Sequence, residues 1–345
     1  MSEKEINQVF VKSPFIFEMR QKNAVVKAND VLIKIKTCGI CGTDVHLAKN
    51  GSPDFLPLGH EISGIVEEVG KNVDRFKPGD QVVAENHTMC GVCSSCKNGQ
   101  PVYCKNIKLY YGIEAGLADY IVLHHTMFNP FNGLSFDEAT MAEPLTVALD
   151  LTKTVEIPLN SDVAVFGGGT IGLLIVQLVK LMGAKSVILV DISSDDEQSR
   201  FRMDIGKKLG ANFTIGYNDP DFYSFINSKY PEGLDRIIIT SPPQTLAGAI
   251  KIAKFGAFIG LIGIVFDERR IVSFDMNEFH FKRLQLRCIH ELPNLLFPLA
   301  LDLIKNKKIS TSDIITHRFK FEDYKKAFEL LEDRNQKAIK VLINI

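Results

Sequence analysis

The stretch VAVFGGGTIG, from Val163 to Gly172, decides most of what the sequence predicts about the fold. A short apolar run with strand character leads into three glycines, and TIGLLIVQLVKLMG then has the length and pattern of a helix. The apolar run SVILVD follows and ends at Asp191. A strand, a glycine turn, a helix and a second strand make a βαβ unit, which predicts a parallel sheet.

The glycines of this turn have the spacing Gly167-x-Gly169-x-x-Gly172, and Asp191 follows nineteen residues after the last of them. Such glycines let the backbone approach a pyrophosphate at the helix N-terminus, and an acid at the tip of the second strand can accept the ribose hydroxyls. The glycine pattern alone is a weak signal, but in a βαβ unit with the acid in place it predicts a dinucleotide site. Asp191 favours NAD over NADP, because its charge would repel a 2′-phosphate.

The segments on either side of this unit differ from it and from each other. The first 130 or so residues are short strands separated by Gly, Pro and Asp, and DVLIKIK places Val31, Ile33 and Ile35 on one face. After the βαβ unit come the strand GLDRIIIT, the helix TLAGAIKIAK and the strand AFIGLIGI. Near the end, AIKVLINI alternates as a strand, and FEDYKKAFELLEDRN has an apolar helix face made of Phe321, Tyr324, Phe328 and Leu331.

Length and charge narrow the classes of protein and ligand. A chain of 345 residues has room for about two domains. With 40 basic against 41 acidic residues, the sequence indicates no nucleic-acid or membrane partner, so small molecules are the expected ligands. The start has no signal-peptide pattern and the longest apolar run, IGLLIVQLV, is too short to cross a bilayer, so we expect a cytoplasmic protein.

Four of the seven cysteines lie in CGVCSSCKNGQPVYC. Cys90, Cys93, Cys96 and Cys104 have the spacing C-x2-C-x2-C-x7-C, and in a reducing cytosol clustered cysteines are more often metal ligands than disulfides. Four thiolates complete the tetrahedral shell of Zn²⁺ and leave no position for a substrate. The pattern therefore favours a structural zinc; an iron–sulfur centre and free thiols are the alternatives.

A second group of possible metal ligands lies in CGICGTDVH and LGHE. A catalytic zinc needs about three protein ligands of mixed type and an open position, and Cys41, His60 and Glu61 supply such a set. By spacing alone, His60 and Glu61 could equally be a surface pair, and CGIC a redox pair. Four roles fit Glu143, in MAEPLTVALD: a helix cap, a buried paired acid, a fourth metal ligand, or the group that holds a metal-bound water.

Taken together, these motifs resemble the zinc-containing medium-chain alcohol dehydrogenases, and more closely their polyol (sorbitol/L-iditol) and threonine dehydrogenase branch. The resemblance covers nearly the whole chain through CGICGTDVH, LGHEISGIVEEVG, KPGDQVV, the four cysteines, AEPLTVAL, GGGTIGLL and THRF. It implies an α/β protein with a GroES-like, β-rich catalytic domain at residues 1–146 and 289–345. A Rossmann NAD-binding domain with a doubly wound parallel sheet would occupy residues 147–288.

The resemblance also assigns roles to single residues. Cys41, His60 and Glu61 match the catalytic zinc ligands, and Glu143 matches an acid that binds this metal directly or through water. Thr43 and His46 match the groups that pass the substrate proton to solvent, whereas Cys38 matches no ligand and is expected to be a small buried residue. The four clustered cysteines match a structural zinc, which makes two zinc ions per chain. The positions matching cofactor contacts are Gly167, Gly169, Thr170, Ile171, Gly172, Asp191, Arg202, Ile262, Gly263 and Ile264.

The sequence departs from this family in three places. After Asp191 it inserts SSDDEQSR, which would displace Arg202 from the adenosine, and whose Asp195 and Asp196 either deepen the repulsion of a 2′-phosphate or form a solvated loop. Leu47 stands where sorbitol dehydrogenases have a tyrosine, and RCIHELP offers Glu291 and Leu292 where they have an arginine and a tyrosine. Unpaired polar groups cost about 1 to 3 kcal/mol each, so these changes argue against sorbitol itself.

The expected function is the oxidation of a secondary alcohol in a polyol, sugar or related small molecule to a ketone, with zinc and NAD. An L-threonine 3-dehydrogenase-type amino-alcohol dehydrogenase and a polyol-phosphate dehydrogenase are the alternatives within the family. A zinc-free quinone reductase and a non-catalytic NAD-binding protein are the alternatives outside it. Relatives are commonly dimers or tetramers, so a homo-oligomer is expected.

Overall fold

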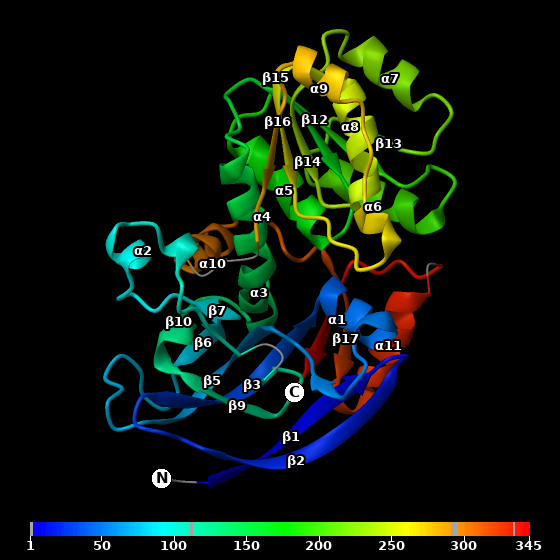
Figure 1. The fold of residues 1–345 in the computed structure, drawn as a ribbon. Coiled ribbons are helices and arrows are strands. Elements are labelled where there is room, and N and C mark those ends of the chain that lie inside the picture. The colour runs from blue at the N-terminus through cyan, green and yellow to red at the C-terminus, as the bar shows by residue number, and fades with distance from the viewer. Residues whose placement is uncertain (1–2, 111–112, 291–294, 334) are drawn as a thin grey trace.

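Two sheets organise the computed structural model, which describes residues 3–110, 113–290, 295–333 and 335–345 (Figure 1). The seven-stranded sheet has the order β10-β6-β5-β3-β18-β17, with β9 also paired to β3. Its strands are β3 (Asp30–Ile40), β5 (Glu61–Val69), β6 (Gln81–Ala84), β9 (Tyr120–His124), β10 (Phe128–Pro130), β17 (Ile315–Lys320) and β18 (Lys340–Asn344). Because β18 pairs antiparallel with β3, the end of the chain completes a sheet that its beginning starts.

Smaller elements surround this sheet. A three-stranded sheet has the order β2-β1-β4, and β7 pairs with β8 beside the clustered cysteines. These strands are β1 (Glu3–Lys12), β2 (Ile16–Val25), β4 (Leu56–Pro57), β7 (His87–Thr88) and β8 (Lys108–Leu109). The short helical segments are α1 (Gly42–His46), η1 (Leu47–Gly51), α2 (Ser94–Lys97), η2 (Pro101–Tyr103), η3 (His125–Met127), α3 (Phe136–Thr140) and η7 (Phe321–Asp323).

The predicted apolar faces are confirmed in this part of the molecule. Val31, Ile33 and Ile35 are fully buried in one cluster. The apolar face predicted for FEDYKKAFELLEDRN lies on α11 (Tyr324–Glu332), where Tyr324 and Phe328 pack against Val341 of β18. The last strand and the last helix therefore cover each other, which helps to hold β18 between β3 and β17 in the seven-stranded sheet.

The six-stranded parallel sheet has the order β13-β12-β11-β14-β15-β16. Its strands are β11 (Asp162–Phe166), β12 (Ser186–Asp191), β13 (Phe213–Gly216), β14 (Leu234–Ile239), β15 (Ala253–Leu261) and β16 (Gln285–Cys288). The helical segments around it are α4 (Ala142–Thr154), α5 (Thr170–Leu181), α6 (Glu197–Lys208), α7 (Phe222–Lys229), η4 (Pro243–Thr245), α8 (Leu246–Ile252), η5 (Glu268–Arg270) and α9 (Met276–Phe281). The helix α10 (Phe297–Lys305) packs against α4 and α3. The strand predicted for AFIGLIGI ends at Leu261, earlier than its pattern indicates.

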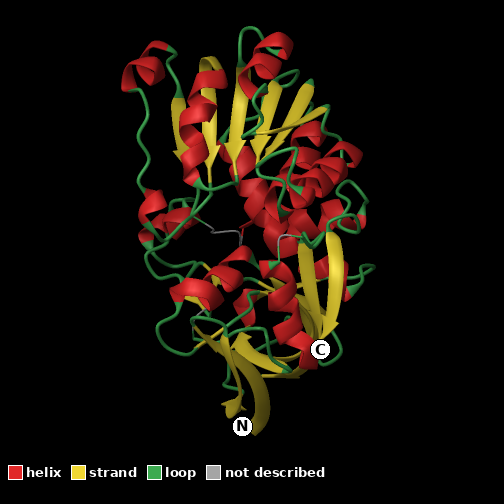
Figure 2. Ribbon diagram, turned by 90° about the vertical axis from the view of Figure 1, so that its right-hand side faces the viewer, coloured by secondary structure: helices red, strands yellow, loops and turns green. Residues whose placement is uncertain are grey.

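Helices lie on both faces of this sheet (Figures 1 and 2). The alternation of β11 explains why, since Val163 and Val165 join one apolar cluster while Ala164 and Phe166 join the other. The strand order reverses beside β11, and in such sheets ligands bind at the carboxyl ends of the strands next to the reversal. The predicted α/β class is confirmed, with a β-rich part and a doubly wound parallel sheet.

The predicted domain boundaries at residues 146 and 289 remain predictions. The helix α4 runs through the first of them and contacts both β5 and β15, so it links the two sheets. No helix within the described ranges is long and apolar enough to cross a membrane.

Candidate metal and cofactor sites

Cys41, His60 and Glu61 form a compact cluster of potential metal ligands. One ligand atom from each lies within 4.8 Å of the others. Cys41 lies directly before α1. Glu61 is the first residue of β5 and follows His60, so the turn before β5 has to place both His60 and Glu61 in the cluster. That turn requires Gly59, which has φ +92° and lies so close to Cys38 that an added Cβ would be 2.6 Å from its Sγ. Cys38 itself is fully buried, as predicted.

Asp44 supports this cluster through hydrogen bonds to the backbone beside its ligands. Its carboxylate is buried and accepts hydrogen bonds from the backbone N–H groups of Cys41 at 2.9 Å and Gly59 at 3.1 Å. Its Oδ1 also lies 3.7 Å from Nδ1 of His60. A carboxylate on one nitrogen of an imidazole directs the other nitrogen, here Nε2, toward a metal. Sequence reasoning missed Asp44, although it lies within CGTDVH.

The charge of His60 depends on these neighbours. Burial opposes the charged imidazole, but the acidic charges of Asp44 and Cys41 outweigh burial and raise the pKa of His60 well above its ordinary value. Without a cation among them, the acidic groups therefore hold a proton on His60. A metal has to displace this proton when it binds, because only the neutral imidazole is a ligand.

Glu61 is clamped by Lys340 from the last strand. The Nζ of Lys340 donates to both carboxylate oxygens of Glu61 at 2.7 Å and to the backbone oxygen of Ile40 at 3.0 Å. Both side chains are almost completely buried. The carboxylate also presses on Gly39, where an added Cβ would lie 2.0 Å from Oε2. Burial disfavours the charge of Lys340, but Glu61 outweighs it and raises the pKa of the ammonium.

Glu143 lies close to the cluster but outside the set of ligand atoms that fall within 4.8 Å of one another. It occupies the first turn of α4, is buried, and accepts a hydrogen bond at 2.9 Å from Nδ2 of Asn86. Oδ1 of Asn86 in turn lies 3.0 Å from Nδ1 of His87. Asn86 and His87 thus connect Glu143 to the strand that leads into the clustered cysteines.

The predicted relay residues lie on α1. Thr43 is half-buried, and His46 ends the helix. The Nε2 of His46 is buried and has no hydrogen-bond partner among the described residues. The imidazole stacks on Phe266, a residue that follows β15, with ring centroids 4.4 Å apart. The assignment of a proton relay to Thr43 and His46 remains a prediction.

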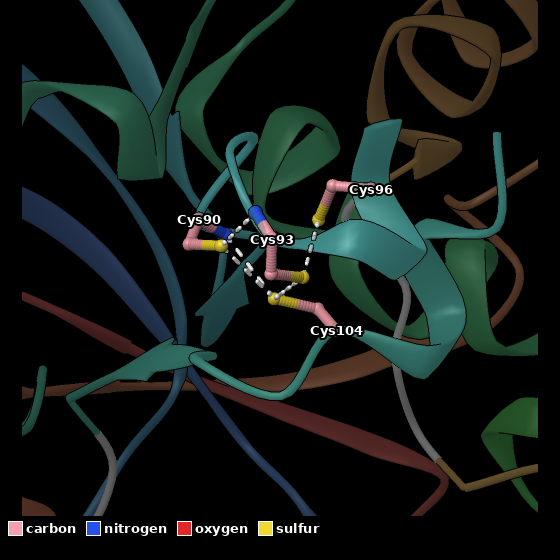
Figure 3. Close-up of side chains that lie close together, drawn as sticks. All are labelled: Cys90, Cys93, Cys96 and Cys104. Atoms are coloured by element: carbon pink, nitrogen blue, oxygen red, sulfur yellow. Dashed lines mark hydrogen bonds between the residues drawn. The ribbon is translucent and has the colours of Figure 1, made fainter. Parts of the chain in front are cut away.

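The four clustered cysteines converge on one point (Figure 3). Sγ of Cys93 lies 3.5 Å from that of Cys96 and 3.9 Å from that of Cys104, which is 3.5 Å from that of Cys90. Four sulfurs at 2.3 Å from a central zinc would be about 3.8 Å apart, so the arrangement fits a tetrahedral ion. The distances are far too long for a disulfide, and all four thiols are free.

Backbone hydrogen bonds favour the ionised form of one thiol in this cysteine cluster. The N–H groups of Cys96 and Lys105 lower the pKa of Cys93 to about 6. Desolvation, together with hydrogen bonds to Cys93, raises the pKa of Cys96 to about 12. Thiols in contact cannot all ionise together unless a cation neutralises them, so the cluster has the properties of a metal site.

The glycine turn shapes the candidate cofactor site. Gly167 has φ +103°, and an added Cβ would lie 2.6 Å from Oγ1 of Thr240. Gly172 packs so closely that an added Cβ would be 1.8 Å from the backbone oxygen of Gly167. The helix α5 then begins at Thr170 with Gly169 as a cap that has no side chain, which leaves its first N–H groups facing outward for an anion.

Asp191 ends β12 beside this turn, as predicted. Its Oδ1 accepts a hydrogen bond from the N–H of Ile192 at 2.8 Å, whereas Oδ2 is buried and has no hydrogen-bond partner among the residues that the structure describes. Burial raises the pKa of Asp191, and the nearby Arg202 counteracts this. A cavity of about 270 Å³ opens next to it, between Phe166, Val190, Tyr217 and Pro242. A buried acceptor beside an apolar slot fits a ribose and its attached base.

Arg202 is not displaced by the insertion after Asp191. An added Cβ on Gly168 would lie 2.6 Å from Oδ2 of Asp191 and 2.9 Å from Cβ of Arg202, so the arginine stands directly at the turn. The insertion is absorbed because α6 begins within it, at Glu197. Asp196 caps that helix by accepting from the N–H of Ser199 at 2.7 Å, and Asp195 is exposed.

The remaining predicted contacts surround the turn. Gly263 approaches the backbone oxygen of Ser241 so closely that an added Cβ would be 1.8 Å away, and Ile262 and Ile264 flank it. Ile171, in the first turn of α5, is partly buried against the apolar cluster that contains residues of α4 and α5. Oγ1 of Thr170 donates to the backbone oxygen of Ile339 at 3.4 Å, which brings the turn next to Lys340.

Three positions bear on the substrate: Leu47, Glu291 and Leu292. Leu47 is half-buried directly after His46, so an apolar side chain stands at this position. Glu291 and Leu292 lie outside the described residues. Sequence reasoning also missed Lys340 and Asn86; a lone charge within the apolar AIKVLINI was the one signal that pointed to Lys340.

Two family models match the chain. The alcohol dehydrogenase GroES-like domain matches residues 27–132, and the zinc-binding dehydrogenase model matches residues 170–306. The L-idonate 5-dehydrogenase of Vitis vinifera is 30% identical over 92% of this chain and 88% of its own length. The L-arabinitol 4-dehydrogenase of Aureobasidium melanogenum is 29% identical over 94% and 90%. The L-threonine 3-dehydrogenase of Burkholderia multivorans is 28% identical over 92% and 93%.

Solved structures are similar over almost the full length. A short chain alcohol dehydrogenase of Escherichia coli complexed with NADH has a TM-score of 0.89 at 25% identity, covering 99% of both chains. A zinc-binding dehydrogenase of Sinorhizobium meliloti bound to NADP has a TM-score of 0.86 at 26% identity, covering 99% of this chain and 100% of that one. The galactitol-1-phosphate dehydrogenase of Escherichia coli has a TM-score of 0.85 at 27% identity, covering 98% and 100%.

Fold, ligand clusters and matches define a zinc-binding dehydrogenase built from a GroES-like and a Rossmann part. The chain belongs to the zinc-containing medium-chain alcohol dehydrogenase family, in its polyol and threonine dehydrogenase-like branch. It is an enzyme, a zinc-dependent alcohol dehydrogenase that uses a nicotinamide cofactor.

Proposed function

We propose that this enzyme oxidises a secondary alcohol of a polyol, sugar or related small molecule to a ketone and transfers the hydride to NAD. One observation supports this most strongly. A largely buried cluster of mixed ligands, Cys41, His60 and Glu61, lies in the same molecule as a nucleotide turn beside which Asp191 has a buried Oδ2 that lacks a side-chain or backbone partner by distance and angle among the described residues. Zinc there would act as a Lewis acid that lowers the pKa of a bound alcohol, and NAD would accept the hydride.

The chain's own residues prepare the metal site. Asp44 orients His60, and Lys340 directs the carboxylate of Glu61 by hydrogen bonds to both of its oxygens. Three protein ligands leave one position of a tetrahedral ion for an alcohol, unless Glu143 takes it; either Glu143 is an exchangeable ligand or it holds a water beside the metal. Both roles agree with its burial and with the hydrogen bond from Asn86.

The proton of the alcohol is proposed to leave through Thr43 and His46. The Nε2 of His46 is buried without a hydrogen-bond partner among the described residues, so it can accept a proton there. An imidazole suits this task, because it titrates near neutral pH.

The four clustered cysteines are proposed to hold a second, structural zinc. Their sulfur distances of 3.5 to 3.9 Å suit a tetrahedral site. Four thiolates complete the shell, so no substrate could reach the metal. The seven free cysteines also support the proposal of a cytoplasmic enzyme, since reducing compartments keep thiols free.

NAD is proposed over NADP because of Asp191. Its buried carboxylate would hydrogen-bond the ribose hydroxyls and repel a 2′-phosphate. Arg202 supplies the opposite charge next to it, and the solved relatives include complexes with both cofactors. The preference is therefore to be measured as a ratio of kcat/KM for the two cofactors.

The substrate is proposed to carry fewer hydroxyl groups near its reacting carbon than sorbitol does. The apolar Leu47 offers no hydrogen bond to a hydroxyl, and a buried hydroxyl without a partner costs about 1 to 3 kcal/mol. Threonine-type amino alcohols and polyol phosphates are the second candidates, because relatives of both kinds match the chain. A homo-oligomer, dimer or tetramer, is proposed by family likeness.

A substrate panel tests the proposal. Purified enzyme would be assayed with polyols, sugar acids, polyol phosphates and threonine, each with NAD and NADP, while reduced cofactor is measured by absorbance. Metal content would be counted by mass spectrometry. We expect two zinc ions per chain and turnover of one polyol-type class with NAD. No turnover in any class, or fewer than two zinc ions per chain, would contradict the proposal.

A further inference from the structure

The segment after β15 reaches from the six-stranded sheet to α1 in the β-rich part of the molecule. Figure 1 shows this yellow segment descending toward α1. Its Phe266 lies against the last residue of α1, and the rings of Phe266 and His46 are 4.4 Å apart and inclined by 20°. The two rings are stacked, and their contact connects two parts of the fold that are far apart in sequence.

The imidazole of His46 also interacts electrostatically with Asp267, the residue that follows Phe266. Its Nε2 is buried and has no hydrogen-bond partner among the described residues. On one edge the ring lies against Gly51, where an added Cβ would be 3.2 Å from Cδ2 and 3.3 Å from Nε2. Packing therefore sets the plane of the ring, with Phe266 covering the face and Gly51 closing the edge.

Phe266 is itself tied to the cofactor cavity. Nη1 of Arg270 donates to the backbone oxygen of Phe266 at 3.4 Å, which closes the segment on itself. Nε2 of Gln244 donates to the backbone oxygen of Arg269 at 2.6 Å, and Gln244 lines the cavity beside Asp191. The position of Phe266 thus depends on the same short segment, η4, that lines the candidate cofactor cavity.

We propose that Phe266 is a positioning residue for proton transfer: by stacking on His46 it holds the imidazole so that Nε2 is placed to accept the substrate proton. The proposal rests on the proposed function, which gives His46 its role. It adds that the six-stranded sheet, through the segment 262–271, controls the geometry of a group on α1. Phe266 would touch neither the substrate nor the zinc in order to act.

Two substitutions at Phe266 separate stacking from mere bulk. Phe266→Leu removes the aromatic face, and Phe266→Tyr keeps it. We expect Phe266→Leu to lower kcat about tenfold with little change in the KM of the alcohol, since an aromatic pair contributes roughly a factor of ten. Phe266→Tyr should retain most of kcat. Equal losses in both variants would overturn the proposal.

A matched control is available in Phe281. This residue is also exposed and also contacts a histidine, His280, at 5.4 Å between centroids, but it lies on α9. Phe281→Leu should leave kcat unchanged. In a His46→Gln background, Phe266→Leu should cost nothing further, because residues that act through one another are not additive. A tenfold loss that persists in this background would show that Phe266 acts elsewhere.

A readout without catalysis tells failure of this inference from failure of the proposed function. In NMR spectra of histidine-labelled protein, one ring signal, absent in His46→Gln, should be shifted upfield by the stacked phenyl ring. Phe266→Leu should abolish this shift and Phe281→Leu should not. An inactive enzyme that shows the shift would refute the function while the stack stands. An active enzyme in which Phe266→Leu changes neither the shift nor kcat would refute the inference.

Discussion

The two cysteine-containing clusters differ in how they are assembled. The four clustered cysteines come from fifteen consecutive residues, and their sulfurs contact one another and backbone N–H groups of the same segment. The Cys41, His60 and Glu61 cluster is mixed and lies among charged groups, with Asp44 on one side and Lys340 on the other. A site that needs only its own ligands can be local, whereas a site that keeps a position open needs support from the rest of the fold.

Charge separates the two clusters further. The cysteine cluster is partly exposed, so solvent can help to neutralise its thiolates. In the mixed cluster only Cys41 is half-buried, and the two buried members each face a buried group of opposite charge: His60 faces Asp44, and Glu61 faces Lys340. Removing one member of such a pair leaves an uncompensated charge away from water. The mixed cluster should therefore respond to substitutions at distant positions.

The largest contrast is expected from His60→Ala. The loss of this ligand should abolish turnover while the protein stays folded, because the cysteine cluster is left intact. Activity, circular dichroism and zinc content would be measured, and one zinc per chain should remain. His125→Ala, a histidine in η3, is the matched control and should keep full activity. A folded His60→Ala variant with normal turnover would remove the catalytic role from this cluster.

Cys96→Ser should act in the opposite way. With one of four thiolates missing, the structural zinc is lost, and we expect the free energy of unfolding to fall by more than about 5 kcal/mol. Thermal unfolding and zinc content would show this, while the fraction that is still folded should turn over alcohol. If Cys96→Ser lost turnover and kept its stability, the roles of the two clusters would have to be exchanged.

Lys340→Met tests whether the mixed cluster depends on the end of the chain. It would leave Glu61 buried without its partner and should cost about 3 to 5 kcal/mol in zinc-free protein. Bound zinc would neutralise part of that charge, so the loss measured by denaturant unfolding should be smaller in zinc-loaded protein. The double variant Lys340→Met with Glu61→Gln should recover much of the stability. A neutral Lys340→Met would show that the clamp contributes nothing.

The smallest expected effect is a pH dependence of the zinc-free protein. Asp44 and Cys41 outweigh burial and raise the pKa of His60, so its protonated form stabilises the fold. This stability is fully present below the unfolded pKa of about 6.5 and is lost as the pH rises through the folded pKa. The melting temperature of zinc-free protein should therefore fall as the pH rises above neutrality. Zinc-loaded protein, in which His60 is neutral, should not show this decline.

Asp44→Asn provides the control for this pH dependence. Without the carboxylate, the folded pKa of His60 should fall, and the decline above neutral pH should flatten. Zinc affinity should also drop by about 10 to 100-fold, because the imidazole loses the group that orients it. An unchanged pH profile in this variant would mean that another group carries the proton.

Much of the fold could be predicted because short segments of the sequence determine it. The turn from Gly167 to Gly172 needs glycine at positions where a Cβ would collide with neighbouring atoms, and the spacing of the glycines shows this requirement in the sequence alone. The apolar faces of DVLIKIK and FEDYKKAFELLEDRN follow from the period of a strand and of a helix. The position of Arg202 could not be predicted, because it depends on where α6 begins within the inserted residues.

The sequence by itself determined the class of the protein, the dinucleotide turn with Asp191, and the cysteine cluster, because each is encoded within a short stretch whose backbone geometry follows from residue type and spacing. Only the tertiary structure decided that Lys340 clamps Glu61 across 279 positions, that Asp44 supports His60, and that Phe266 stacks on His46. These contacts arise where β18 enters beside β3 and where the segment after β15 meets α1. They depend on how distant elements pack, and no local pattern in the chain encodes that packing.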